Sequence, residues 1–82
     1  MWYVYILQCN SNALYTGITI DVAARLRRHR AGRGSAYVRQ QGACRIVYVE
    51  SHDTKSTALK RELAIKGWSR LKKLSLLTTV RN

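Results

Sequence analysis

The first 20 residues carry no charged side chain, and this stretch constrains the fold more than any other part of the chain. Residues 2–8 are mostly aromatic or aliphatic, which favours a β-strand. Asn10-Ser11-Asn12 is a turn signal, and residues 14–18 have the composition of a second strand, so a hairpin is predicted. Because side chains alternate along a strand, Tyr3 and Tyr5 share one face. The opposite face carries Trp2, Val4 and Ile6.

The rest of the chain has the pattern of helices with one strand between them. Asp21 and Ser69 are suited to cap helices, and Gly32 and Gly67 are suited to end them. The predicted elements are a helix over 22–31, a strand over 45–50, a helix over 54–66 with Leu59 and Leu63 one turn apart, and a last helix whose leucines 71, 74 and 77 face the core. Between the first helix and the strand lies a basic, glycine-punctuated loop.

The order β-β-α-β-α-α predicts one α+β domain over residues 1–82, a small antiparallel three-stranded sheet flanked by helices. The uncharged opening is not a membrane span, because polar residues interrupt it from Gln8 to Asn12, short of the roughly 20 apolar residues required. It also lacks the basic start and cleavage site of a signal peptide. We therefore expect a cytoplasmic protein.

Two cysteines, Cys9 and Cys44, lie far apart in the sequence. A disulfide framework normally has more cysteines and a secreted context, so both thiols are expected to be reduced. Together with His29 and His52 they offer four zinc ligands in principle, but the paired spacing typical of zinc sites is absent.

The charge of the chain indicates that it binds nucleic acid. The chain has 15 Lys and Arg against 4 Asp and Glu, a net charge of +11 and a pI near 10.5. Such a balance is typical of a protein that binds phosphate backbones. Ribosomal and architectural proteins share this composition, so charge alone does not indicate an enzyme.

The four acidic residues limit what metal chemistry is available: Asp21, Glu50, Asp53 and Glu62. A two-metal phosphodiesterase needs several clustered carboxylates, so one cation on one carboxylate is the most this chain can hold. Glu62 is the best candidate because it adjoins the apolar residues of its helix. An ion pair with Lys66, four residues on, explains Glu62 equally well at this stage.

Other candidates are individually weak. Arg25 and His29 are four residues apart and share a helix face, where an arginine can clamp a phosphate and a histidine can support it or move a proton. They are equally consistent with an ordinary basic helix. Tyr5 and Tyr15 lie on the two hairpin strands, where tyrosine is common. Gly17, inside a strand pattern, indicates close approach of another backbone or a ligand.

Taken in order, these pieces resemble a known family. Tyr3-Val4-Tyr5 followed by Tyr15-Thr16-Gly17 is similar to the paired motif that names the GIY-YIG endonuclease superfamily. Arg25 with His29, and the stretch Ala58–Glu62, resemble its first helix and its glutamate-bearing helix. The runs 15–19 and 66–69 are most similar to its small, single-domain bacterial branch (UPF0213-like). The resemblance covers nearly the whole chain.

The resemblance implies a metal-dependent endonuclease with five catalytic residues. Tyr5 would act near the attacking water, as a general base, and Tyr15 would hold that water. Arg25 would bind the scissile phosphate, His29 would support it, and Glu62 would hold one Mg²⁺ or Mn²⁺. Further contacts to nucleic acid are expected from Gly17, Arg27, Arg28, Arg33, Arg39 and Lys66. An unperturbed tyrosine has a pKa of about 10, so Arg25 and the metal would have to favour the phenolate.

The sequence departs from the family pattern at Tyr3 and Val4 in the first motif, at Thr16 in the second, and at Asn82, a doubtful match for a late asparagine. A single one-metal site in a monomer would cut DNA one strand at a time. The many cations, with Tyr37 and Trp68 as stacking surfaces, suit single-stranded or branched DNA.

Several alternatives stay open. Trp68 is equally suited to the core, and RNA is also an open alternative as the substrate. The main functional alternative is a catalytically silent nucleic-acid-binding module on the same fold. A protein-interaction subunit ranks last, because the sequence contains no heptad pattern.

Overall fold

The computed structural model describes residues 1–10, 12–30 and 44–80 of the chain. Three strands form one antiparallel sheet in the order β2-β1-β3, with β1 (Trp2–Cys9) between β2 (Leu14–Thr19) and β3 (Cys44–His52). The helices are α1 (Val22–Arg30), α3 (Lys55–Lys66) and α4 (Arg70–Val80). The predicted α+β class and strand arrangement are confirmed, with element ends within two residues of those expected wherever the structure describes them.

Local signals explain where these elements begin. Asn12 closes the hairpin between β1 and β2 with a φ of 66°, a conformation that asparagine tolerates better than most residues. The Asp21 side chain accepts a hydrogen bond from the Ala24 amide at 3.0 Å. Thr54 and Ser69 cap α3 and α4 in the same way. None of the helices in the described ranges combines the length and apolar character that a membrane crossing demands.

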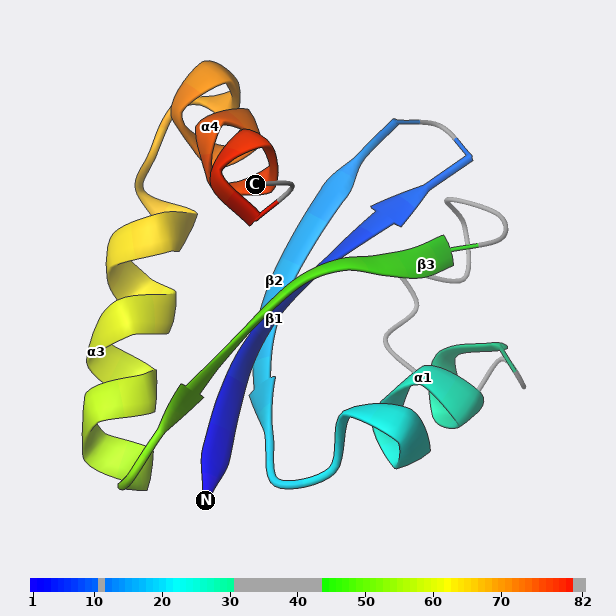
Figure 1. The fold of residues 1–82 in the computed structure, drawn as a ribbon. Coiled ribbons are helices and arrows are strands. Elements are labelled where there is room, and N and C mark those ends of the chain that lie inside the picture. Colours follow the sequence, from blue (N-terminus) through cyan, green and yellow to red (C-terminus); the bar gives the residue numbers. More distant parts are fainter. Residues whose placement is uncertain (11, 31–43, 81–82) are drawn as a thin grey trace.

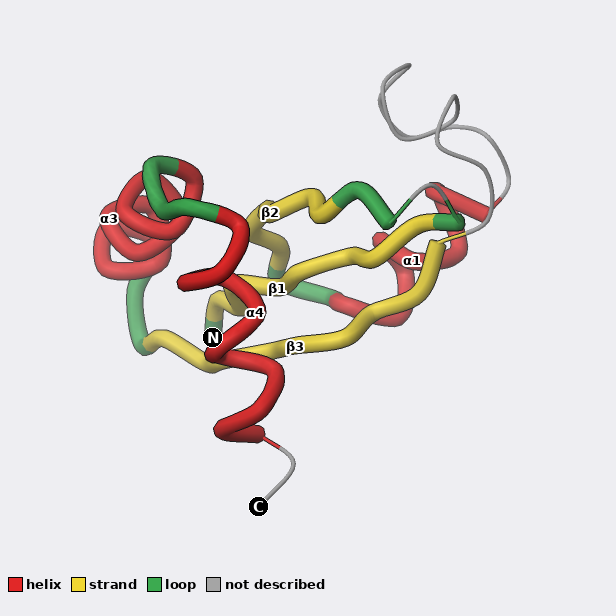
Figure 2. The backbone as a smooth tube through the Cα atoms, turned by 90° about the horizontal axis from the view of Figure 1, so that it is seen from above, coloured by secondary structure: helices red, strands yellow, loops and turns green. Residues whose placement is uncertain are grey.

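The sheet lies between α1 on one side and α3 with α4 on the other (Figures 1 and 2), and it separates two hydrophobic clusters. On one face, α3 and α4 cover Val4 and Ile6, and the buried partners from α3 are Ala58 and Ile65. On the other face lies α1, whose Leu26 packs near the buried residues Tyr5, Leu7 and Cys9. The strand alternation predicted for β1 is therefore confirmed, and it places Tyr5 on the α1 face.

Two helix faces differ from the expectation. Neither leucine of α3 is buried in the core, since Leu59 is 38% exposed and Leu63 is 67% exposed. Leu71 is 82% exposed, whereas Leu76 packs against the first cluster. The predicted apolar stripes on these helices were wrong at those positions, because each helix orientation is set by contacts outside the helix itself.

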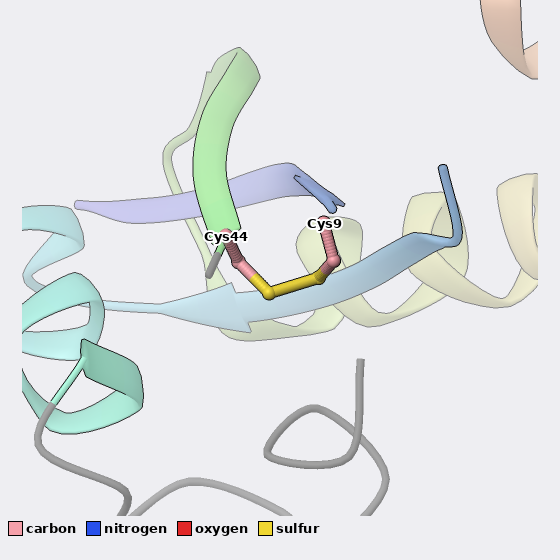
Figure 3. Close-up of a disulfide and its surroundings, with 2 residues drawn as sticks. All are labelled: Cys9 and Cys44. Carbon is pink, nitrogen blue, oxygen red and sulfur yellow. A yellow bond between two sulfur atoms is a disulfide. The ribbon is translucent and has the colours of Figure 1, made fainter. Parts of the chain in front are cut away.

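Cys9 and Cys44 occupy paired positions on β1 and β3, and their sulfur atoms are bonded to each other (Figure 3). The expectation of two reduced thiols was wrong, because strand register places residues 35 positions apart directly opposite each other. Both sulfurs are used in this bond, so neither is available to bind zinc with His29 or His52.

Breaking this disulfide is expected to lower the free energy of unfolding by about 4 kcal/mol, because a loop closed across 35 residues restricts the unfolded chain. Urea denaturation of the oxidised protein and of a Cys9→Ser/Cys44→Ser variant measures the difference. Added reductant should shift the parent midpoint and leave the variant unchanged. Equal midpoints in oxidising buffer would contradict the prediction.

Candidate active site

Tyr5 lies at the middle of the central strand, directly opposite Gly17 on β2. A Cβ atom at Gly17 would stand 2.6 Å from the Tyr5 hydroxyl oxygen and 2.8 Å from its ring carbon Cζ. These distances are far below van der Waals contact, so the tyrosine ring occupies the space that any other side chain would need. Gly17 is closely approached, as predicted, but by the Tyr5 side chain and not by another backbone or a ligand.

The Tyr5 phenol is 1% exposed, and burial raises its pKa to about 12. Arg25, from α1, acts against this change through its positive charge and its hydrogen bond to the phenol. Tyr15 and Glu62 act in the same direction as burial, because their charged forms are negative. Arg25 therefore favours the phenolate, as the resemblance requires. Burial has the larger effect, so the pKa of Tyr5 stays above its usual value.

His29 closes the α1 side of this group. Its ring centroid lies 5.9 Å from that of Tyr15 and 6.5 Å from that of Tyr5. The residue is 8% exposed, and neither ring nitrogen has a hydrogen-bond partner among the described residues. Burial, with the charges of Arg25 and Arg28, lowers its pKa. A neutral imidazole with unpaired nitrogens can bind a phosphate oxygen or a water.

Glu62 approaches from α3. Its side chain is 13% exposed, and its carboxylate lies 3.4 Å from the Lys66 ammonium nitrogen. Its negative charge acts to raise the pKa of Tyr5. The ion pair with Lys66 is formed through one carboxylate oxygen, and a carboxylate paired in this way can still bind a cation through its other oxygen.

The structure groups Tyr5, Tyr15, Arg25 and His29 on the α1 side of the sheet, whereas Glu62 comes from α3, which packs on the other face. Arg27 and Arg28 are exposed on α1, next to the site. Lys66 is paired with Glu62 on α3. Arg33, Arg39, Tyr37 and Asn82 fall outside the described residues.

Trp68 is part of the hydrophobic core and does not form a separate stacking surface. It packs against the first hydrophobic cluster, and its ring faces two cations, the Arg61 guanidinium carbon at 5.0 Å and the Lys72 nitrogen at 4.4 Å from its centroid. Of the two roles considered for this tryptophan, the core role is the one that fits its contacts.

One polar group escaped sequence reasoning. Tyr48, Glu50 and His52 alternate along β3, so their side chains share one face, and Glu50 bonds to both neighbours and to Arg61 of α3. Glu50 was interpreted as a strand end only. A polar residue at every second position of an otherwise apolar strand is the signal that could have revealed this cluster.

The side chains that could bind a metal ion determine which cation would fit the site. The described residues contain no group of three or more His, Cys, Asp or Glu side chains placed to hold a metal ion. Glu62 is a single half-buried carboxylate paired with Lys66, and Mg²⁺ is commonly held by one or two carboxylates with waters and substrate phosphates. The residues therefore fit a hard divalent cation bound jointly with a phosphate, and they do not fit zinc.

Comparison with known proteins identifies the family of this chain. The family model described as the GIY-YIG catalytic domain matches residues 1–75. A UPF0213 protein of Haloquadratum walsbyi is 47% identical over 74 residues, 90% of this chain and 83% of its own length. A UPF0213 protein of Staphylococcus aureus is 45% identical over 75 residues, 92% of each chain.

One solved structure has a similar fold. The solution NMR structure of a UPF0213 protein from Bacillus halodurans matches with a TM-score of 0.62 and 39% identity, over 96% of this chain and 85% of that one. The paired tyrosine motifs, the site built on them and these similarities lead to one conclusion: the chain belongs to the GIY-YIG family, a nuclease superfamily, and is similar to its small UPF0213 proteins.

Proposed function

We propose that this protein is a divalent-cation-dependent endonuclease that hydrolyses DNA one strand at a time. The observation that carries the proposal is the grouping of Tyr5 of β1 with Arg25 and His29 of α1, while α3 supplies the carboxylate of Glu62. These groups supply the three parts that phosphodiester hydrolysis needs: a group that acts on water, a cation for the phosphate, and a carboxylate for a metal ion.

Arg25 is placed to bind the scissile phosphate, because its guanidinium lies beside Tyr5 and can form two parallel hydrogen bonds to phosphate oxygens. The unpaired ring nitrogens of His29 provide a second contact to the same group. Tyr5 and Tyr15 act on the attacking water, with Tyr5 as the base. Holding phosphate and water together accounts for a large part of the rate acceleration.

Glu62 would hold the cation, Mg²⁺ or Mn²⁺, as one carboxylate ligand among waters and phosphate oxygens. The bound ion would neutralise negative charge on the leaving oxygen. Lys66, paired with Glu62 at 3.4 Å, lies where it can turn to a phosphate once Glu62 bonds to the cation.

The net charge of +11 and the exposed Arg27 and Arg28 beside the site favour a polyanionic substrate. One site of this kind in a monomer cuts one strand at each visit. We propose single-stranded or branched DNA as the preferred substrate, because Tyr5 is buried and a flexible strand can follow the site more closely than a rigid duplex.

The proposal is tested with end-labelled single-stranded, duplex and forked DNA in Mg²⁺, Mn²⁺ or EDTA. We expect cation-dependent cleavage by the parent protein, fastest on single-stranded or forked DNA. Glu62→Gln should retain about one hundredth of that rate or less, while DNA binding persists. Asp53→Asn, which neutralises an exposed carboxylate outside the site, is the matched control and should cleave normally.

The same experiment separates the alternative function. Tight DNA binding without cleavage by the parent protein, on every substrate and with either ion, would replace the nuclease proposal with a catalytically silent binding module. Faster cleavage of the matching RNA would change the substrate class and leave the chemistry in place.

A further inference from the structure

Glu50 on β3 holds a cluster of polar groups outside the candidate active site. Its carboxylate accepts a hydrogen bond from the Tyr48 hydroxyl at 2.6 Å and lies 2.6 Å from Nε2 of His52. The Nε atom of Arg61, on α3, donates to both carboxylate oxygens at 3.2 and 3.0 Å. Burial acts to raise the pKa of Glu50, but these bonds outweigh burial and hold the pKa below its usual value. Glu50 is therefore ionised at neutral pH.

Arg61 is also held from its other side. Its guanidinium carbon lies 5.0 Å from the ring centroid of Trp68, and Trp68 packs against the hydrophobic cluster beneath α3 and α4. Both contacts are partly buried, where ion pairs and cation–π contacts are stronger than on an open surface. Arg61 thus ties α3 to β3 and to the start of α4.

The next residue along α3 is Glu62, and the helix directs the two side chains to opposite flanks. Successive residues turn by about 100° around a helix axis, so Arg61 lies about 60° to one side of Ala58 and Glu62 about 40° to the other. Ala58 and Ile65 form the buried stripe between them. Arg61 reaches β3, at one edge of the sheet, and Glu62 lies on the other flank of the helix, where it is 13% exposed and pairs with Lys66. The rotation of α3 about its axis therefore decides where the Glu62 carboxylate lies.

Hydrophobic contacts alone do not favour this rotation. Two of the three large apolar residues of α3, Leu59 and Leu63, are 38% and 67% exposed, whereas the buried stripe contains Ala58 and Ile65. Turning the helix by about 130° would bring Leu59 and Leu63 onto the sheet and carry Glu62 away from its observed position. Burial of two leucines is a substantial driving force for that alternative, so an opposing interaction must hold the observed rotation.

We propose that Arg61 and Glu50 are positioning residues that fix the rotation of α3 and thereby keep the Glu62 carboxylate in the active site. Arg61 and Glu50 would act through Glu62, because their own contacts are with each other and with Tyr48, His52 and Trp68. The inference rests on the proposed function for the role of Glu62, but the rotation of α3 is a structural property that can be measured without any cleavage assay.

The test compares Arg61→Met with Lys60→Met, which removes the same charge from an exposed position one residue earlier on α3. Methyl NMR reports which side chains of α3 contact Val4 and Ile6. In the parent and in Lys60→Met these should be Ala58 and Ile65. In Arg61→Met we expect new contacts from the leucines 59 and 63. Cleavage should fall about 10- to 100-fold, as with other residues that orient a metal ligand.

A rescue variant separates positioning from a general loss of stability. Adding Leu59→Gln and Leu63→Gln to Arg61→Met removes the competing apolar face, so the parent contacts and most of the lost cleavage should return. Glu50→Gln, which keeps the shape of the side chain and loses its charge, provides the same comparison if Arg61→Met does not fold.

Unchanged α3 contacts in both Arg61→Met and Glu50→Gln would overturn the proposal, as would a loss of cleavage that the leucine substitutions do not restore. If the parent protein does not cleave DNA, the nuclease proposal fails by itself. The NMR contacts then still decide whether the Glu50–Arg61 pair sets the rotation of α3.

Discussion

Replacing Tyr5 by phenylalanine is expected to reduce DNA cleavage by about 10²- to 10⁴-fold, the usual contribution of a positioned acid or base. The substitution removes only the hydroxyl from a ring that is 1% exposed, so the fold should persist. Because the pKa of Tyr5 is raised to about 12, the reactive phenolate gains about tenfold per pH unit across the neutral and alkaline range. The parent rate should therefore rise about tenfold per unit from about pH 7 to 10, and this rise should vanish in Tyr5→Phe.

Tyr3→Phe is the matched control, since it makes the same change on the same face of β1 two residues earlier. Single-turnover cleavage over the pH range, with denaturation curves for all three proteins, gives the comparison. A Tyr5→Phe variant that retains the parent rate and the parent pH profile would remove Tyr5 from the role of general base and shift attention to Tyr15.

Gly17→Ala is expected to damage both the fold and the site. The new Cβ would stand 2.6 Å from the Tyr5 hydroxyl oxygen and 2.8 Å from Cζ, so the ring or the β1–β2 pair must move. Overpacking of this kind costs about 1–3 kcal/mol. Displacing Tyr5 relative to Arg25 by about 1 Å is expected to cost about 100-fold in rate. Urea denaturation and single-turnover cleavage measure the two effects.

Gly67→Ala is the control for Gly17→Ala, because a Cβ there meets nothing closer than 3.5 Å, at the carbonyl oxygen of Ala64. That distance is ordinary contact, so Gly67→Ala should be close to neutral in stability and in cleavage. If Gly17→Ala behaves like Gly67→Ala in both measurements, Tyr5 has room to move without consequence, and its placement over Gly17 is not needed for activity.

The local patterns of the sequence were sufficient to predict the order of the strands and helices. The apolar alternation of residues 2–8, the asparagine turn and the helix caps at Asp21 and Ser69 each act within a few residues of chain, and all three were predicted correctly. The candidate site residues could be named from the sequence, because the spacing of the tyrosine motifs, Arg25, His29 and Glu62 resembles a family pattern; their catalytic roles stay a prediction. The sequence did not reveal their distances or the faces of the sheet on which they lie.

Tertiary structure decided what local patterns could not. Strand register placed Cys9 opposite Cys44 and Tyr5 opposite Gly17, and register depends on pairing across the sheet. The same pairing brought Glu50 within reach of Arg61. By its own pattern of apolar residues, α3 would bury Leu59 and Leu63, yet it buries Ala58 and Ile65. A helix responds to every surface that it contacts, so its final rotation is a property of the assembled fold and not of the segment alone.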